Sequence, residues 1–358
     1  MPMSQNLDRY QRQMIFPGIG ELGQQRLLAA TAVVVGCGAT GSMLAMLLAR
    51  AGVGCLRIID RDFVELTNLQ RQVLFCEEDV AQALPKAEAA ARALRRMNSA
   101  IAIEGVVADV NPGNVLALLA DATVVLDGTD NFTTRYLLND ACLKLGKPWV
   151  YTGVIASWGM TATFVPDEAV TLAGGRSATG CLRCLLGDMP APGTTPGCDT
   201  AGVLGPAVSL ISSVGASEAI KLITQTGALN PGLLHMDLWT HEYEALGALP
   251  RDPACPACAA QRYDFLDARS GATATSLCGR NAVQVVVRGA PPLDLAQVER
   301  QLAPVAQGGA HSIVRNAFLL RAQVGGYEFT IFPDNRAIIK GTDDEEVARS
   351  LYARYVGG

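Results

Sequence analysis

Histidine and charged side chains are scarce in this chain, and each shortage argues against a class of function. Three histidines occur in 358 residues, at His235, His241 and His311, which argues against a catalytic triad built on histidine. Only 18% of the residues are charged, the net charge is −5, and no basic block occurs, so the footprint of a nucleic-acid partner is missing. The longest apolar stretches, such as Val203 to Ile211, are too short to span a bilayer, and we expect no membrane partner.

The first residues contain neither a basic segment nor an apolar one, so we expect no secretory leader. Ten cysteines would suit disulfides in a small secreted domain. In a chain of this length they indicate metal or thiol chemistry in a reducing compartment, and we expect a cytoplasmic protein. The 49% apolar content predicts a substantial core, and the length allows one large domain and a smaller one.

A glycine-rich turn follows the first strongly apolar segment. The sequence Gly-Cys-Gly-Ala-Thr-Gly comes directly after three valines and is followed by a helical pattern from Ser42 to Arg50. This strand–turn–helix context is the one that a G-x-G-x-x-G nucleotide loop requires. Gly36 allows the tight turn, Gly38 lets the backbone approach a phosphate, and Gly41 lets the helix pack closely on the strand.

Asp60 ends the second strand pattern, where a carboxylate can bind the hydroxyls of a ribose. The glycine loop and Asp60 alone would suggest an NAD(P)-dependent oxidoreductase, and that alternative stays open at this point.

Apolar strands alternate with amphipathic helices in the first half of the chain. This order predicts an α/β fold, a Rossmann-like and mainly parallel sheet with helices on both faces and an antiparallel extension. The expected strands are 31–35, 55–59, 101–107, 123–126 and 149–151, and the expected helices are 42–50, 80–97, 111–120 and 131–145. A helix over 206–224 and strands over 232–238 and 242–246 follow, and a fresh α+β pattern starts after about residue 276.

A dehydrogenase would not account for three polar clusters at the ends of these elements. They are the segments Asn68–Gln72, Pro85–Lys86 and Asp127–Asn131. Arg71 and Lys86 supply two cations, as a reaction at the α-phosphate of ATP needs when charge grows on the phosphoryl oxygens and on leaving pyrophosphate. Asp130 is placed to hold Mg²⁺ that bridges the phosphates. Taken singly, each cation would by default be interpreted as a solvated helix charge, since most charged residues are.

Asp127 has a different expected role in the third cluster. We expect it to be the structural member of the acidic pair, capping the helix that follows the strand.

Two C-x-x-C knuckles stand far apart in the chain, at 181–184 and 255–258. Four thiolates from Cys181, Cys184, Cys255 and Cys258 would make a closed, structural Zn²⁺ site. From the spacing alone, two unrelated pairs or a redox dithiol stay open.

With these motifs in order, residues 7 to about 260 resemble the ThiF/MoeB family of adenylyltransferases, relatives of the ubiquitin-activating enzymes. The resemblance rests on segments 9–13, 36–41, 68–72, 85–86, 129–131 and 201–205, together with Asp60 and the paired cysteines. It implies ATP, Mg²⁺ and Zn²⁺ as cofactors. It also implies roles for individual residues: Asp60 and Asn68 in nucleotide binding, Arg71 and Lys86 on the phosphates, Asp130 on Mg²⁺ and the four knuckle cysteines on zinc.

The family resemblance also implies partners. Arg12 would reach the ATP of a neighbouring subunit, which implies a homodimer. The substrate would be the C-terminal Gly-Gly carboxylate of a small ubiquitin-like sulfur carrier, converted to an acyl-adenylate with release of pyrophosphate. A thiocarboxylate for thiamine, molybdopterin or a related metabolite would follow. Cys198, in a loop just before a helix, would serve as a nucleophile there. No rhodanese domain is evident, so a separate sulfur donor protein is expected. The alternatives are the oxidoreductase and a non-catalytic nucleotide or carrier scaffold.

The domain boundaries follow from these patterns. We expect an adenylation domain over 1–270, with the nucleotide-binding half over about 1–152 and a crossover loop over about 166–205. A small α+β domain over 276–358 resembles an extension found in a subset of bacterial homologues, and carrier docking is one hypothesis for it. Cys278 is interpreted as an inert core thiol, and the terminal Gly357-Gly358 as a frayed end that resembles a carrier tail.

Overall fold

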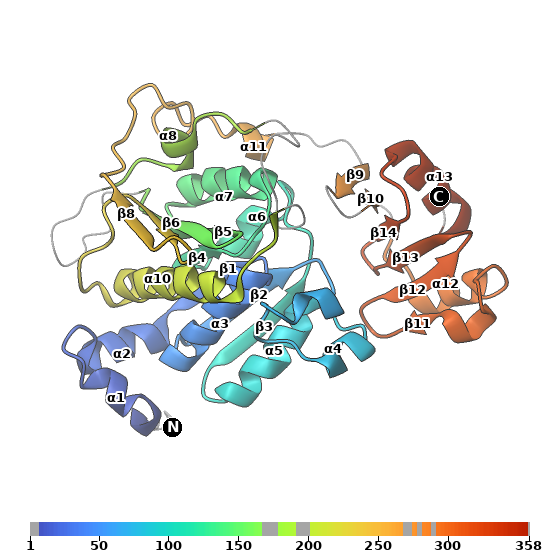
Figure 1. Ribbon diagram of the computed structural model, residues 1–358, viewed down its shortest axis with the longest axis horizontal. Helices are drawn as coiled ribbons and strands as arrows, with labels where there is room; N and C mark the ends of the chain where they lie inside the picture. Colours follow the sequence, from blue (N-terminus) through green and yellow to red (C-terminus); the bar gives the residue numbers. More distant parts are fainter. Residues whose placement is uncertain are drawn as a thin grey trace. The chain divides into compact units, whose positions relative to one another are not determined.

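The computed structural model describes residues 7–166, 178–190, 201–267, 274–277, 281–287 and 291–356. The chain divides into two compact units (Figure 1). The first comprises Met1–Val80 and Lys86–Ala268, and the second comprises Ala81–Pro85 and Arg269–Gly358.

An eight-stranded sheet forms the centre of the first unit, in the order β3-β2-β1-β4-β5-β6-β7-β8. The first five strands in this order are parallel, and β5 to β8 pair antiparallel. The strands are β1 Thr31–Val35, β2 Cys55–Asp60, β3 Ala102–Val107, β4 Val124–Asp127, β5 Trp149–Ile155, β6 Trp158–Phe164, β7 Leu233–Asp237 and β8 Glu242–Leu246. The predicted parallel sheet with an antiparallel extension is therefore confirmed.

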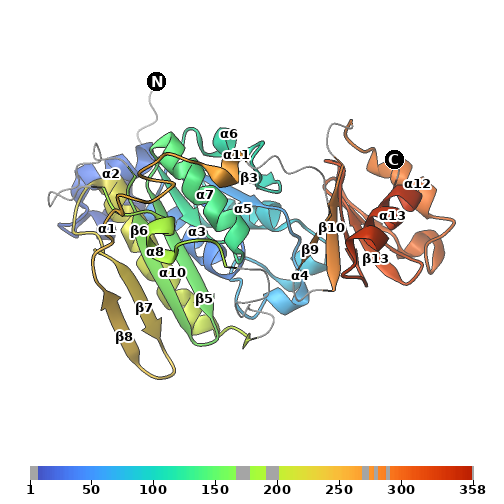
Figure 2. The same ribbon diagram turned by 90° about the horizontal axis from the view of Figure 1, so that it is seen from above.

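Helices cover both faces of this sheet (Figures 1 and 2). Helices α6 and α7 pack on one face, and α3, α5 and α10 pack on the other. The described residues of this unit contain helices α1 Gln11–Met14, α2 Gly20–Ala29, α3 Ala39–Ala51, α4 Glu77–Ala81, α5 Lys86–Met97, α6 Val115–Leu119, α7 Phe132–Leu145, α8 Leu182–Leu186, α10 Gly205–Thr224 and α11 Asp264–Asp267. Short 3-10 turns, η1 Leu7–Tyr10 and η2 Leu66–Asn68, complete them.

The two-residue period of the strands supplies the core on each face. Val33 and Val35 of β1 join Val125 of β4 and Trp149 of β5 in one buried cluster beneath α6 and α7. The intervening side chain of Val34, also fully buried, points to the opposite face. A strand buried on both faces is what parallel α/β sheets require, which explains the continuous valine run.

One helix is longer and more apolar overall than the short apolar runs of the sequence predicted. Helix α10 is long and apolar enough to cross a membrane by length and composition, although its unbroken apolar stretches are short. It lies against α3, β5 and β6, and 61% of its most apolar window is buried. Its apolar surface is therefore used in the core of the first unit.

The helix predicted over 80–97 is wrong at its start. Helix α4 ends at Ala81 and α5 begins only at Lys86. Pro85 lacks a backbone N–H and disfavours helical backbone in the residue before it. Ala83 has a positive φ of 47°, which a continuous helix cannot contain. Lys86 therefore lies in the first turn of its helix.

The second unit is a six-stranded sheet in the order β11-β12-β13-β14-β10-β9, antiparallel throughout. Helices α12 and α13 bury one face of it, with Val283, Phe329, Ile339 and Tyr352 in a common core. The elements are β9 Ala274–Leu277, β10 Ala282–Val286, α12 Leu295–Leu302, η3 Gly309–Ser312, β11 Val314–Arg315, β12 Leu320–Val324, β13 Tyr327–Ile331, β14 Arg336–Lys340 and α13 Glu345–Tyr355. The α+β class of this unit matches the prediction.

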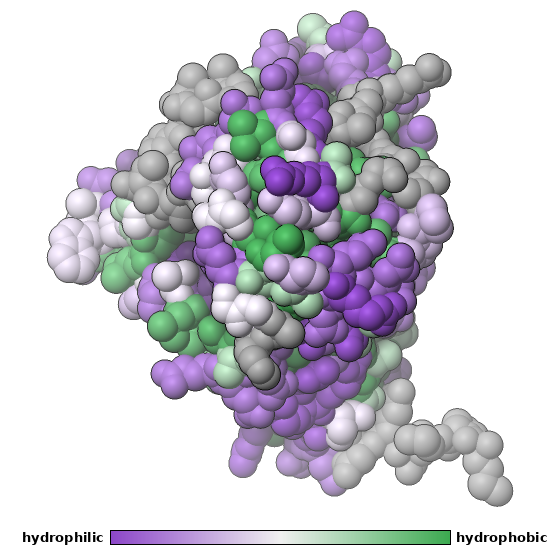
Figure 3. Space-filling view, turned by 90° about the vertical axis from the view of Figure 1, so that its right-hand side faces the viewer, coloured by the Kyte–Doolittle hydropathy of each residue, from purple (hydrophilic) through white to green (hydrophobic). Residues whose placement is uncertain are grey.

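Among the described residues of the second unit, the large apolar side chains that are exposed are scattered valines, at Val305, Val314 and Val347. The face drawn in Figure 3 is likewise mostly hydrophilic, with smaller apolar areas between the polar ones. These observations leave carrier docking on this unit a hypothesis.

Candidate functional site

Three glycines bring the nucleotide loop against the end of β4. Gly36 has a positive φ of 85°, and a Cβ there would lie 2.7 Å from the carbonyl oxygen of Gly128. A Cβ at Gly41 would overlap the carbonyl oxygen of Gly36, so helix α3 packs as closely as predicted. At Gly128 a Cβ would lie 2.6 Å from the Cα of Gly41. Gly128 was not predicted as part of the site, although its place between a strand and an Asp-rich turn was a signal.

Asp60 lies at the carboxyl end of β2, beside this loop. Its Oδ2 accepts a hydrogen bond from the backbone N–H of Cys37 at 2.6 Å, and its Oδ1 accepts one from Asp62 at 2.7 Å. Burial raises the pKa of Asp60, and the charge of Lys86 opposes that rise. The carboxylate thus ties the strand end to the glycine loop, where each oxygen retains acceptor capacity for a ribose hydroxyl.

Lys86 is buried in the first turn of α5, next to Asp60. Its Nζ lies 3.5 Å from Oδ2 of Asp62, and its backbone N–H donates to the Asp62 carbonyl at 2.8 Å. Arg61 adds a cation that the sequence analysis missed. Its Nη1 lies 2.9 Å from Oδ1 of Asp109 at the end of β3, and its charge also interacts with Asp130. The signal for Arg61 was its position directly after Asp60, the acid expected to bind ribose.

The segment around Asn68 forms a short turn held by its own side chains. Asn68 and Glu65 make a reciprocal capping box, with the Oδ1 of Asn68 accepting from the Glu65 N–H at 3.1 Å. Arg71 is partly exposed and donates to the carbonyl of Thr67 at 3.0 Å. Gln70 approaches the carbonyl of Val203 at 3.5 Å, so this turn lies beside the start of α10. In this conformation the side chain of Asn68 therefore stabilises its own turn.

Asp127 and Asp130 occupy one turn and differ in their surroundings. Asp127 is fully buried and accepts hydrogen bonds from the N–H and hydroxyl of Thr129 and from Nε of Arg135. Burial raises the pKa of Asp127, and Arg135 opposes that rise. The predicted helix cap is wrong at this residue, because Asn131 is the N-cap and accepts from Thr134. Asp130 is exposed, in contrast to Asp127.

Arg12 is exposed and lies with elements at the opposite edge of the sheet. Its neighbour Gln13 donates to the carbonyl of Ala51 at the end of α3, and Tyr10 accepts from Asn98 just after α5. Helices that return from a parallel strand end at the amino edge of the sheet. Within one chain, Arg12 therefore does not join Asp60 at the carboxyl edge.

The four knuckle cysteines converge, although 74 positions separate Cys181 from Cys255. Their sulfurs all lie within 4.8 Å of one another, and the Cys181–Cys255 and Cys184–Cys258 pairs are 3.6 and 3.4 Å apart. Tetrahedral zinc with Zn–S bonds of about 2.3 Å needs sulfurs about 3.8 Å apart. Burial raises the pKa of Cys181 and Cys258, the latter to about 11, so these thiols need a cation to ionise. The set fits zinc.

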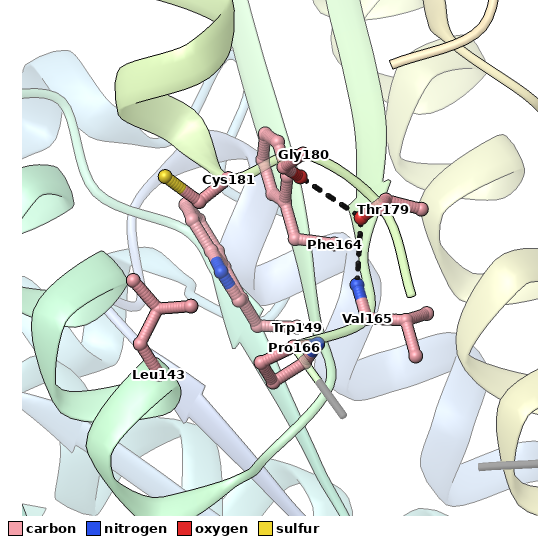
Figure 4. Close-up of a pocket in the computed structure, with 8 residues that line it drawn as sticks. All are labelled: Leu143, Trp149, Phe164, Val165, Pro166, Thr179, Gly180 and Cys181. Atoms are coloured by element: carbon pink, nitrogen blue, oxygen red, sulfur yellow. Dashed lines mark hydrogen bonds between the residues drawn. The ribbon is translucent and has the colours of Figure 1, made fainter. Parts of the chain in front are cut away.

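A small pocket of about 180 Å³, counting the part open to solvent, lies beside Cys181 (Figure 4). The rings of Trp149 and Phe164 line it and stack on each other with centroids 4.7 Å apart, and the Thr179 hydroxyl bridges Val165 and Gly180. It lies at the amino end of β5, away from the strand ends that carry Asp60 and Asp130. It is therefore not the nucleotide site.

Several predicted features lie outside the described residues. They are Cys198, Cys278, most of the crossover loop and Gly357-Gly358.

Comparisons with known proteins decide the family. A model of the ThiF family matches residues 10–257. The chain belongs to the ThiF family. The sulfur carrier protein ThiS adenylyltransferase of Bacillus subtilis is 40% identical over 350 residues, 98% of this chain and 99% of that protein. The SAMP-activating enzyme E1 of Haloferax volcanii is 40% identical over 73% of this chain and 92% of its own length.

A solved structure of Escherichia coli MccB with ATP has the same fold. It aligns with a TM-score of 0.60 at 24% identity, over 72% of this chain and 76% of that one. Together with the sequence relatives, the ThiF membership identifies the chain as an adenylyltransferase. Adenylyl transfer is thus favoured over the oxidoreductase and over the non-catalytic scaffold.

Proposed function

We propose that this adenylyltransferase activates the C-terminal carboxylate of a ubiquitin-like sulfur carrier that ends in Gly-Gly. A carboxylate oxygen attacks the α-phosphorus of ATP, and the bond from this phosphorus to the oxygen that bridges the α- and β-phosphates breaks. Pyrophosphate is released, and the carrier remains as an acyl-adenylate. The observation that carries the proposal is the gathering of Asp60, Lys86 and the Asp130 turn around one glycine loop. The end-to-end match with a sulfur carrier adenylyltransferase supports the substrate class.

Each residue near the carboxyl edge of the parallel sheet has its own role in this reaction. Asp60 holds the ribose, and the loop from Gly36 to Gly41 lets backbone N–H groups face the phosphates. Lys86 exchanges its ion pair with Asp62 for phosphate oxygens, and Arg71 adds a second cation. Mg²⁺ on Asp130 would neutralise charge on the phosphates. A solved MccB structure of this fold contains ATP, which supports the nucleotide.

We also propose that the active unit is a homodimer with composite sites. Arg12 is exposed and lies far from the carboxyl edge of its own sheet, so it is available to another subunit. Large apolar side chains beside it are exposed, with Ile15, Phe16 and Leu22 at 64%, 61% and 61%. Covering these residues with a second copy would bury apolar surface and bring Arg12 to the partner's ATP.

Zinc and sulfur chemistry complete the proposal. Bound zinc would cross-link the two knuckles as a structural centre. Cys198 displaces AMP from the acyl-adenylate to form a thioester, and sulfide-level sulfur from a separate donor protein then displaces the Cys198 thiolate. The thiocarboxylate that results serves the synthesis of thiamine, molybdopterin or a related product. We place the protein in a reducing, cytoplasmic compartment, in which zinc-ligating and free cysteines both stay reduced. If a Cys198→Ala variant keeps full sulfur transfer, Cys198 has no role in it.

ATP–pyrophosphate exchange tests the adenylation step. The assay contains Mg²⁺ and is run with and without each small Gly-Gly-ended protein encoded in the same genome. We expect exchange that depends on one carrier. Absence of exchange with every carrier, in dimeric protein that holds zinc, would overturn the substrate class. Metal analysis of protein purified without chelator tests zinc separately, and we expect near-stoichiometric content.

A further inference from the structure

Two adjacent polar residues, Asn139 and Asp140, lie fully buried in the middle of α7. A helix that packs against a sheet normally turns apolar side chains inward, so two polar groups there need a structural reason. Neither residue contacts the nucleotide edge. Their hydrogen bonds lead instead to the two segments that carry the cysteine knuckles.

Each residue holds one knuckle segment through its backbone. Oδ1 of Asn139 accepts a hydrogen bond from the N–H of Leu182 at 2.9 Å, between the two cysteines of the first knuckle. Oδ2 of Asp140 accepts one from the N–H of Phe265 at 2.9 Å, in the helix that follows the second knuckle. Nδ2 of Asn139 lies 3.4 Å from Oδ1 of Asp140 and links the two acceptors.

A salt bridge also joins the two knuckle segments directly to each other. Arg183, inside the first knuckle, donates to Asp264 at 2.8 Å, and Asp264 is the residue before Phe265. The two knuckle segments are thus joined to each other and to neighbouring positions of one helix. A zinc ion held by four thiolates carries a net charge of −2, and Arg183 supplies a positive charge between two of the ligands.

We propose that Asn139 and Asp140 are positioning residues of the zinc centre. They hold the two distant knuckles in register, so that four sulfurs converge before metal arrives. The inference rests on the proposed zinc site. Because outer groups that orient metal ligands change affinity by about 10–100-fold, we expect Asn139→Ala and Asp140→Ala each to weaken zinc binding by about 10-fold. Asp140→Asn keeps an acceptor oxygen for Phe265 and should restore most of the affinity.

The control is Asn98→Ala, which removes another buried asparagine of the first unit. Asn98 donates to the carbonyl of Ala49 at 2.7 Å and has no described bond to either knuckle. This variant should lose stability without losing zinc affinity. A loss of affinity common to all destabilised variants would therefore assign Asn139 and Asp140 only a general structural role and overturn the proposal.

The measurement is zinc transfer from the full-length protein to a chromophoric chelator of known affinity, near neutral pH. If wild-type protein holds no zinc, the zinc assignment itself fails. If it holds zinc and the alanine variants hold it equally tightly, the positioning role is wrong while the zinc site stands. Should the alanine variants not fold, Asn139→Ser and Asp140→Asn replace them. We then expect a 10-fold loss for the serine, which is too short to reach Leu182, and a small change for the asparagine.

Discussion

Nε of Arg135 lies 3.0 Å from Oδ2 of Asp127, and both side chains are buried in the first unit. The same guanidinium donates to the carbonyl of Thr129 at 2.7 Å and lies 5.0 Å from the ring centroid of Tyr151. Asp127 in turn accepts from Thr129, so one buried ion pair holds the turn that presents Asp130. The geometry of the candidate magnesium carboxylate therefore depends on a buried arginine five residues further along the chain.

Replacing Arg135 should destabilise the fold strongly. Arg135→Gln leaves the Asp127 carboxylate buried without its cation, and breaking such a pair costs about 3–5 kcal/mol of the free energy of unfolding. Denaturant unfolding measures this loss. Arg57→Gln is the matched control, because Arg57 pairs with the partly exposed Asp121 and Glu104. Its cost should be about 1 kcal/mol or less. Equal costs for the two variants would contradict the structural role of Arg135.

The patterns in the sequence predicted the strand and helix on either side of the Asp130 turn. They did not predict the ion pair between Asp127 and Arg135 that holds this turn. β1 begins and ends as predicted, because a strand buried on both faces of a parallel sheet needs the continuous apolar run that the sequence contains. The contact between Gly128 and Gly36 depends on how two distant strand ends meet, as does the place of Arg135. Single-sequence patterns contain no record of such long-range contacts.

Some helices were also missed, or predicted with the wrong start. Helix α2 was not predicted, because its Gln and Gly residues give a weak apolar period. The helix over 80–97 was predicted as one, although Pro85 signalled a break. The motif residues were easier, since Asp60 and Lys86 stand next to strand and helix ends in a fixed family order.

Glycine substitutions should separate folding from nucleotide binding. A Cβ at Gly38 would have only the Gly128 oxygen nearby, at 3.8 Å, so Gly38→Ala should fold normally. It should raise the KM for ATP about 10-fold, because the methyl group stands where the backbone approaches phosphate. Gly128→Ala should instead lower the melting temperature, since its Cβ would meet Gly41 at 2.6 Å. Thermal melts and exchange kinetics test both, and an unstable Gly38→Ala would contradict the assignment.

The carboxyl of Asp140 should make stability depend on pH. Burial raises the pKa of Asp140 from an ordinary 3.8 to about 6. The folded protein therefore binds this proton more tightly than the unfolded chain, so the Asp140 contribution is present below about pH 4 and is lost as pH rises through about 6. The free energy of unfolding of wild type minus that of Asp140→Asn should fall over this interval and then stay level. Denaturant unfolding with chelator present, so that zinc does not contribute, measures it; a difference that rises with pH would contradict the assignment.

Lys86 should matter for turnover far more than an exposed lysine does. Lys86→Met should lower pyrophosphate exchange by about 10²–10³-fold, by analogy with loss of one preorganised donor to a developing anion. Lys144→Met is the control, because Lys144 is exposed on α7 and faces the ring of Tyr263. That variant should keep its exchange rate. Comparable losses in both variants would point to misfolding, and an unaffected Lys86→Met would remove Lys86 from the phosphate site.

Asp130→Asn should change the magnesium requirement while the fold stays intact. Asp130 is exposed, so the substitution leaves no unpaired buried group and the melting temperature should stay within a few degrees. The neutral amide is a poorer Mg²⁺ ligand than a carboxylate, because the cation prefers charged oxygens. Half-maximal exchange should therefore require about 10-fold more Mg²⁺. Arg61 bears on the same measurement, since its charge interacts with Asp130 from the end of β2. Arg61→Gln should lower the Mg²⁺ requirement by removing a competing cation. A Mg²⁺ requirement unchanged in Asp130→Asn would place the ion elsewhere.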